Sequence, residues 1–291
     1  MSISPCELVV RRLLAEVHNG HRLERLRAHY APDHRDHDPR VAPGSGVAGL
    51  EAFWAELLDA VPDLRVEPGV ALADGDRIML FLLWRGTFRP GTAAERDFEL
   101  HTSEIFEVAG SRITEHWAVA DYSILRPLGF APRQRTDLRR PDLIGVHTAA
   151  ERANAEAVLG SYREVLTEHR LDRAEVYYER DYLHHNRQMP AVPNGVEAFR
   201  AYFAGNFAAY PDLTATVDHL VAGGDRVMVF ATWRGRFTGH SRGRKPTGRA
   251  LILRTSDLFR LVDNRVAEHW EVVDYSGLED VGVPVRQPVA R

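Results

Sequence analysis

The spacing of apolar residues predicts three helices at the start of each half of the chain. The first helix carries apolar residues at the three- and four-residue intervals of an amphipathic helix. These residues are Leu8, Val9, Leu13, Leu14 and Val17. The same spacing returns after residue 150, and Pro62 and Pro211 end the third helix of each half. The predicted helices are residues 7–17, 21–30 and 50–60, then residues 151–167, 169–178 and 196–209.

The pattern changes to alternation after the third helix of each half. Val227, Val229 and Ala231 share one face of a predicted strand, and the Gly-Gly-Asp sequence at residues 223–225 signals a hairpin turn before it. Three helices followed by an antiparallel sheet predict an α+β fold in which the sheet curls around the helices. Such a cone has one open mouth, which favours a buried ligand.

The chain contains the same sequence twice. HRLERLRAHYAPD at residues 21–33 recurs as HRLDRAEVYYERD, and EHWAVADYS at residues 115–123 recurs as EHWEVVDYS, in the same order. A period near 150 residues indicates two whole domains rather than a solenoid of short units. We therefore expect domains at residues 1–132 and 149–291, with an Arg- and Pro-rich linker at residues 133–148.

Composition narrows the classes of function. The chain is 44% hydrophobic and 27% charged, with a net charge of −4 and no long basic run, so it can bury a core. Nucleic acid and membrane are not expected as partners, which leaves a small-molecule hydrophobic substrate. The single cysteine, Cys6, excludes an internal disulfide and a cysteine-rich metal site, and a reducing cytoplasm fits. We expect no cofactor and no metal.

The second half resembles a known family. The string PTGRALILRTSDLFRLVDNRVAEHWEVVD at residues 246–274, together with the hairpin and tryptophan-containing strand before it, resembles the signature of SnoaL-like polyketide cyclases. This family belongs to the nuclear-transport-factor-2-like superfamily. The resemblance covers nearly all of residues 149–282 and, more weakly, residues 5–130. It implies two tandem cone-shaped α+β barrels, each with three helices packed on a curved antiparallel sheet.

The resemblance also implies site residues and an arrangement. In the family, the carboxylate that closes the EHW-x-V-x-D strand acts as general acid/base, and it falls on Asp274 and Asp121. A polar side chain from a His-Asn-like motif enters the pocket. The motif matches His185 and Asn186 in the second half, and His37 and Asp38 in the first. Single domains of the superfamily usually pair through their sheets, so we expect an internal pseudo-dimer within a chain that is monomeric in solution.

The alternation of residues along the last strand of each half predicts which face the same two carboxylates share. Trp270 and Asp274 share one face of the last strand, as Trp117 and Asp121 do, and burial on an apolar face raises the pKa of an Asp toward neutrality. Such a carboxylate abstracts a proton α to a carbonyl, and the enolate closes a ring without metal or cofactor. The enolate oxygen needs a donor, for which the candidates are Asn186, His185 and His269, although His269 points to the opposite face in a regular strand. The other candidate substrate contacts are Trp117, Trp233, Trp270 and His116.

Each candidate has a structural alternative. Asp274 is equally typical of a residue that caps the following turn, and Trp117, Trp233 and Trp270 are typical core residues. Glu115 and Glu268 are candidates for ion pairs with Arg85 and Arg234, or for a second pocket carboxylate. The histidine-rich tract at residues 29–38 is typical of solvated or pocket-lining histidines, with metal binding as the rival. SRGRK at residues 241–245 is typical of a hairpin tip, with an anion clamp as the rival.

The sequence predicts a cofactor-independent cyclase or isomerase of polyketide-type secondary metabolism. One alternative is a hydrolase or dehydratase, which needs an Asp, an Arg and a second carboxylate around a water. Another is a non-catalytic small-molecule-binding module. The volume of the cavity separates them: a cavity below roughly 300 Å³ without a reachable Asp274 or Asp121 favours the binding module. The first half is four residues shorter than the second between its WRG strand and its last two strands, so the mouth of its pocket differs.

Overall fold

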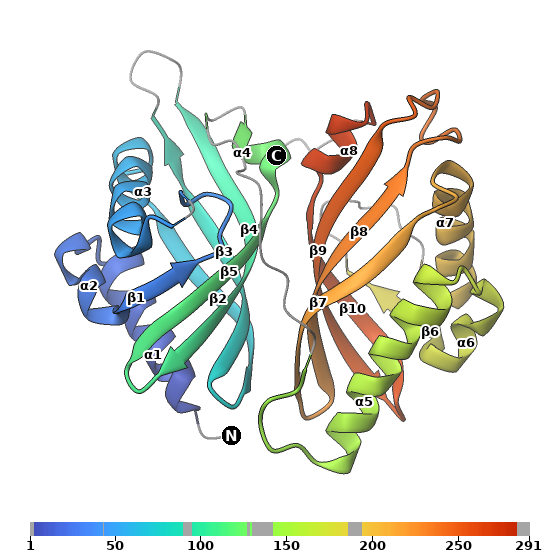
Figure 1. Ribbon diagram of the computed structural model, residues 1–291, viewed down its shortest axis with the longest axis horizontal. Coiled ribbons are helices and arrows are strands. Elements are labelled where there is room, and N and C mark those ends of the chain that lie inside the picture. Colours follow the sequence, from blue (N-terminus) through green and yellow to red (C-terminus); the bar gives the residue numbers. More distant parts are fainter. Residues whose placement is uncertain are drawn as a thin grey trace. The chain divides into compact units, whose positions relative to one another are not determined.

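The chain forms two compact units (Figure 1). The computed structural model describes residues 3–42, 44–89, 95–126, 129, 142–185 and 194–283. The first domain comprises Met1–Leu138 with Ile144–Val146, and the second comprises Arg139–Leu143 with His147–Arg291. The division between them lies inside the segment predicted as the linker. The pairing of the two domains as a pseudo-dimer stays a prediction.

The first domain begins with helices and ends with a five-stranded sheet. The sheet order is β1-β5-β4-β3-β2, in which β1 is parallel to β5 and all other neighbours are antiparallel. The helical elements are α1 (Pro5–Leu13), η1 (Leu14–His18), η2 (Leu23–Arg25), α2 (Leu26–His29), α3 (Gly46–Ala60) and α4 (Tyr122–Leu125). The strands are β1 (Tyr30–Asp36), β2 (Arg65–Asp74), β3 (Arg77–Phe88), β4 (Arg96–Ala109) and β5 (Arg112–Ala120).

The second domain repeats this order, with the sheet β6-β10-β9-β8-β7 and β6 parallel to β10. The helical elements are α5 (Ala149–Gly160), η4 (Ser161–Thr167), η5 (Leu171–Arg173), α6 (Ala174–Tyr177), α7 (Val196–Ala209) and α8 (Ser276–Asp280). The strands are β6 (Tyr178–His184), β7 (Thr214–Gly223), β8 (Arg226–Arg236), β9 (Ala250–Val262) and β10 (Arg265–Asp274). The two α+β domains predicted from the repeat are confirmed.

Local sequence explains where the helices begin and end. The Ser4 side chain accepts a hydrogen bond from the Glu7 amide at the start of α1, and Thr148 with Glu151 forms a capping box at the start of α5. His21 and His169 adopt positive φ after the first helix of each domain. The predicted second helix is shorter than expected, because the chain enters β1 at Tyr30 and β6 at the matching position.

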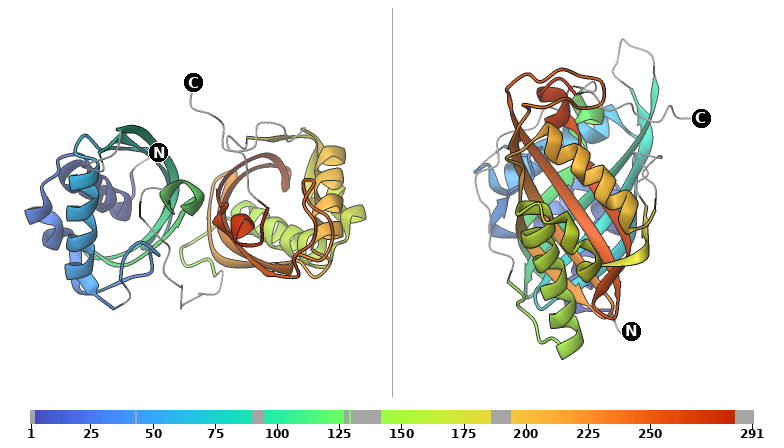
Figure 2. Two further views of the ribbon diagram at one scale, coloured as in Figure 1. Left: turned by 90° about the horizontal axis from the view of Figure 1, so that it is seen from above. Right: turned by 90° about the vertical axis from the view of Figure 1, so that its right-hand side faces the viewer.

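Each sheet curls around its own helices, as the end-on view shows (Figure 2). Buried residues of the helices and of the concave sheet face form one core in each domain, including Trp54 and Trp84 in the first and Tyr162 and Phe259 in the second. This packing encloses space between β9, β10 and α7, which is where the candidate site lies. Among the described residues, no helix is long and apolar enough to cross a membrane.

Candidate active site in the second domain

A cavity of about 120 Å³ lies inside the second domain. Its walls come from η4, α7 and strands β8 to β10, and most of its surface is apolar. Aromatic rings dominate the lining, among them Tyr162, Phe203, Trp233 and Phe259. A mostly apolar cavity with a few polar groups is typical of a small-molecule site. The predicted cone with a ligand cavity is therefore present in this domain.

The residues of β10 that reach the cavity are not the ones expected from alternation. His269, Glu271 and Val273 line it, whereas Trp270 and Asp274 are not among the lining residues. The prediction that Asp274 faces the pocket and His269 faces away is therefore wrong. Alternation tells which residues share a face, but a shift of one residue exchanges the two faces, and the sequence does not say which face is concave.

Both predicted catalytic aspartates accept a hydrogen bond from the backbone amide two residues further on, which was the structural alternative. Asp274 Oδ1 accepts from the Ser276 amide at 3.1 Å, in the turn before α8, whose N-cap is Tyr275. Asp121 is the N-cap of α4 and accepts from the Ser123 amide at 2.9 Å. Both carboxylates are buried. Each carboxylate thus satisfies a backbone amide where the chain leaves the last strand of its domain.

The site carboxylate is Asp257 on β9, which the sequence analysis did not single out. Its Oδ2 accepts from the Tyr162 hydroxyl at 2.8 Å and from Thr255 Oγ1 at 2.6 Å, and its Oδ1 accepts from His269 Nε2 at 2.8 Å. The Trp233 indole in turn donates to Thr255 Oγ1 at 3.1 Å. Three donors around one buried carboxylate hold it in a single orientation.

His269 lies between two partners that define its tautomer. With Nε2–H donating to Asp257, Nδ1 is left to accept from the Tyr182 hydroxyl at 3.1 Å. Burial raises the pKa of Tyr182 and Tyr162 well above the ordinary value, and the charge of Asp257 adds to both shifts. Both phenols therefore stay protonated at neutral pH and remain donors. The Phe259 ring stacks on His269 with centroids 4.6 Å apart.

A second acid lies beside this pair. Glu271 is directly opposite Asp257 in the pairing of β9 with β10, and its Oε1 lies 3.3 Å from His184 Nε2. Two carboxylates opposite each other on one face of a sheet repel, and the histidine partner of each one, with the hydroxyl donors at Asp257, offsets part of that cost. The His184 and His269 rings are 4.8 Å apart. The cavity thus contains two acids, each paired with an imidazole.

The other predicted residues of the second domain divide into two groups. His269 and Trp233 line the cavity, as predicted. His185 instead stacks on Trp270 with centroids 4.6 Å apart and hydrogen-bonds to Glu268 at 2.9 Å, and neither ring is among the lining residues. Glu268 pairs with Arg260 at 2.5 Å, so an ion pair is present but its arginine is not the one expected. Asn186 lies outside the described residues.

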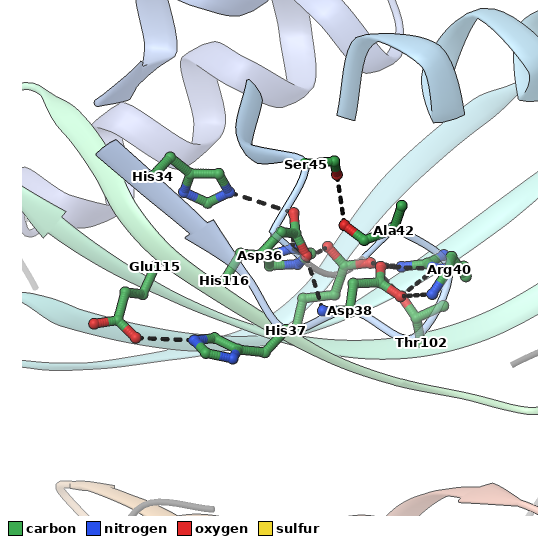
Figure 3. A network of polar contacts seen from close by, with 11 residues as sticks. His34, Asp36, His37, Asp38, Arg40, Ala42, Ser45, Thr102, Glu115 and His116 are labelled. Atoms are coloured by element: carbon green, nitrogen blue, oxygen red, sulfur yellow. Dashed lines mark hydrogen bonds and ion pairs between the residues drawn. The ribbon is translucent and has the colours of Figure 1, made fainter. Parts of the chain in front are cut away.

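The interior of the first domain holds an equivalent pair of an acid and a histidine, and a buried arginine lies beside that pair. Glu104 and His116 occupy the positions of Asp257 and His269, with Nε2 of His116 at 3.2 Å from the Glu104 carboxylate. The Arg40 guanidinium bonds to Asp38 (Figure 3). It also lies 3.1 Å from Glu104. Its Cζ is 5.0 Å from the centroid of the Trp84 ring, and its side chain is only 4% exposed. The arginine therefore packs on Trp84, the counterpart of the cavity residue Trp233, and lies beside the acid of this pair.

The ionisable groups in the interior of the first domain have pKa values far from neutral pH, so they keep their charge there. Burial alone lowers the pKa of His116, but the charges and hydrogen bonds of Asp36 and Glu104 outweigh it and raise the pKa to about 10. Burial likewise opposes ionisation of Glu104, yet His116 and Arg40 lower its pKa to about 2. At neutral pH all of these groups are ionised. Asp38 and His116, predicted to contact substrate, instead belong to this ion-pair network.

His37 and Trp117 complete the predicted set in the first domain. The two rings stack with centroids 4.7 Å apart, and His37 Nε2 lies 3.0 Å from Glu115, which also pairs with Arg35. This is the same contact that His185 makes with Trp270 in the second domain. The predicted partner of Glu115, Arg85, lies near Glu99 instead. The histidine of the His-Asn-like motif therefore packs against a tryptophan of the last strand, β5 or β10, in each domain.

Two groups of side chains among the described residues could hold a metal ion. They are His184, His269 and Glu271 in the second domain, and Asp36, Asp38 and His116 in the first, and in each group the ligand atoms lie within 4.8 Å of one another. Nitrogen and oxygen ligands of this kind suit zinc or iron. In the first domain the Arg40 guanidinium already bonds to Asp38. The expectation that the protein uses no metal stays a prediction.

Fold and site together define a class. Each domain is an α+β cone of the nuclear-transport-factor-2-like type, and the second encloses paired acids and imidazoles in an aromatic cavity. The family model described as SnoaL-like polyketide cyclase matches residues 8–127 and again residues 156–280, which is most of the chain. The chain therefore belongs to the SnoaL-like polyketide cyclase family, as a tandem duplication of its domain.

Solved structures match one domain of the chain at a time. A protein described as a SnoaL-like polyketide cyclase from Jannaschia sp. CCS1 is 25% identical, covering 48% of this chain and 98% of its own, with a TM-score of 0.44. TsrD from Streptomyces laurentii is 28% identical over 47% of this chain and 96% of its own, with a TM-score of 0.40. IdmH from Streptomyces antibioticus, described as a polyketide cyclase, is 27% identical over 45% and 99%, also with a TM-score of 0.40. No functionally curated protein matches the chain.

Proposed function

We propose that the second domain catalyses proton transfer on a polyketide-type substrate, leading to enolisation and intramolecular ring closure. The observation that carries this proposal is the pair of opposed acids, Asp257 and Glu271, each held by a histidine inside an aromatic cavity. A sheet places two like charges opposite each other at a cost to stability. Acid/base chemistry gives that arrangement a use, because it needs one group to take a proton and another to stabilise the developing charge.

Glu271 is the base and His269 is the donor in this mechanism. The Glu271 carboxylate removes a proton from the carbon next to a substrate carbonyl. In this complex His269 carries a second proton on Nδ1, which donates to the carbonyl oxygen in place of the hydrogen bond that Nδ1 accepts from Tyr182 in the free protein. Ligand atoms of these two residues lie within 4.8 Å of each other, which matches the reach needed to contact a carbon and its neighbouring carbonyl together. Asp257 orients His269 and stabilises the imidazolium.

Ring closure follows from the enolate. Its carbon attacks a second carbonyl of the same chain, one carbon–carbon bond forms, and the new alkoxide takes back the proton held by Glu271. No atom is lost and no oxidant is consumed, so the step needs no cofactor. The aromatic walls, among them Trp233 and Phe203, exclude water and fold the substrate. The hydration alternative also finds its residue types in the cavity, Asp257, Glu271 and Arg242, but the donors that hold Asp257 are Tyr162, Thr255 and His269 rather than an arginine.

A non-catalytic binding module is the second candidate. The cavity volume of about 120 Å³ is below the size expected for an enzyme pocket of this class, and neither Asp274 nor Asp121 lines it. By the criterion set from the sequence, both facts favour binding alone. The opposed acids favour chemistry, and an experiment on proton transfer separates the two.

The test is exchange of the protons next to the carbonyl of 1-tetralone in D₂O, followed by NMR. The native chain is expected to accelerate exchange, and Glu271→Gln and Asp257→Asn to lower that rate about 10²-fold or more. Asp274→Asn is the matched control, since it changes a buried carboxylate that accepts the Ser276 amide and is not among the residues that line the cavity. Tetralone that binds but is not exchanged supports the binding module. Full exchange by Glu271→Gln refutes the mechanism.

A further inference from the structure

The positively charged hairpin of the second domain has an unusual turn. Ser241 and Arg244 exchange backbone hydrogen bonds of 3.2 and 2.7 Å, which closes a turn with two central residues. Both central residues have positive φ, 48° at Arg242 and 74° at Gly243. Hairpin turns of this type favour Asn or Asp followed by Gly, because other side chains are strained in the left-handed region. An arginine here goes against local preference, and strain of this kind is found at ligand sites.

The turn carries its arginine to the cavity. Ser241 and Arg242 are both lining residues, alongside Tyr202, Asn206 and Tyr210 on the helix side. Arg242 is the one lysine or arginine among the described residues that line the cavity. The hydroxyls, the amide and the guanidinium are all hydrogen-bond donors, so this end of the cavity suits an oxyanion.

The lining of the cavity carries charges of both signs. Tyr202 lies within the electrostatic influence of both Glu271 and Arg242: beyond the effect of burial, the former raises the pKa of its phenol, and the latter lowers it through its charge and a side-chain hydrogen bond. The acids repel an anion and the guanidinium attracts one, so an anionic ligand is expected to place its negative group at Arg242.

We propose that Arg242 forms an anion subsite and that the ligand of this cavity is an aromatic or polyketide-type carboxylic acid. Its carboxylate binds the guanidinium, its rings or folded chain contact the tyrosine-rich wall, and its reactive carbonyl lies at Glu271 and His269. A planar guanidinium binds a carboxylate through two parallel hydrogen bonds, which fixes the direction in which the ligand enters. The proposal rests on the proposed function for its choice of cavity, but the subsite is tested by binding alone.

The test compares two probes that differ in charge, 2-naphthoate and its neutral methyl ester, by titration calorimetry. Arg242→Asn removes the charge and places a residue that tolerates positive φ, so folding is expected to be unharmed. We expect it to weaken naphthoate binding about tenfold or more, the loss of one charge-assisted contact, and to change ester binding less than twofold. Arg244→Asn is the control, because Arg244 lies in the same hairpin but is not a lining residue.

Each result has one meaning. Selective loss of naphthoate binding in Arg242→Asn, with Arg244→Asn unchanged, supports the subsite. Equal losses for both probes, equal losses in both variants, or no loss in Arg242→Asn overturns it. If the subsite is supported but the native chain does not exchange tetralone protons, the proposed reaction fails and the subsite remains. If exchange depends on Glu271 but naphthoate ignores Arg242, the reaction remains and the subsite fails.

Discussion

The interior arginine of the first domain gives the sharpest test of how that domain is stabilised. Arg40→Met keeps most of the side-chain volume and the contact with the Trp84 ring, but it removes the positive charge between Asp38 and Glu104. Both carboxylates are buried, with side chains only 2% exposed, so water cannot replace the lost partner. We expect the first domain to lose stability.

The magnitude follows from the cost of leaving a buried charge without its partner, about 3–5 kcal/mol. Because every 1.4 kcal/mol is tenfold in an equilibrium constant, opening of the first domain is expected to become at least on the order of 10²-fold more frequent. Hydrogen exchange read by mass spectrometry resolves this by domain. Peptides from β3 and β4 should lose protection, while peptides from β8 and β9 keep theirs.

A second variant separates charge from packing. Arg40→Met combined with Asp38→Asn and Glu104→Gln removes the charges on both sides, and we expect most of the stability to return, because neutral groups cost far less to bury. The reasoning is refuted if Arg40→Met leaves exchange in the first domain unchanged, or if the triple variant is no more stable than the single one. The latter result would mean that the guanidinium acts through its contact with the aromatic rings.

Two further predictions concern pH and packing. The pKa of His116 is raised to about 10 from an ordinary 6.5. Its contribution to the stability of the first domain is therefore complete below about pH 6.5 and is lost as the pH rises toward 10. The Tm measured by thermal unfolding should fall across this range, and the fall should be absent in His116→Gln. In the second domain, a Cβ at Gly160 would lie 2.7 Å from the Tyr177 ring, so Gly160→Ala should cost about 1–3 kcal/mol in urea unfolding. Gly205→Ala, whose Cβ meets nothing within 4 Å, should instead be neutral or stabilising by up to about 1 kcal/mol.

The fold could be predicted from the sequence because its signals are periodic and occur twice. Helical spacing in the opening segments and the repeated EHW strand were enough to define two α+β domains. The face of that strand could not be predicted, since alternation is symmetric and the choice between Asp274 and Glu271 depends on which side of the sheet is concave. A signal for Asp257 was present: an acid recurs after Thr-Ser and before two apolar residues in TSEIF and TSDLF, at Glu104 and Asp257.

Arg40 could not be predicted in the same way. It lies outside any periodic segment, after β1, and its burial depends on carboxylates that come from its own loop and from β4. The sequence presents it as one arginine among many polar residues. In the second domain the position opposite the site carboxylate is Glu271, whereas Ala118 stands opposite Glu104 in the first. The duplicated domains thus differ at the residue to which the proposed mechanism assigns the role of base.

The arginine inside the first domain has a consequence for how the chain responds to its ligand. The guanidinium of Arg40 is part of the chain, so the partner of Asp38 and Glu104 is present whatever small molecules surround the protein. A compound that binds the cavity of the second domain is expected to raise the stability of that domain as its concentration rises above its Kd. We therefore expect such a compound to slow hydrogen exchange in the second domain, while the ion pairs of Arg40 keep the same partners with or without it.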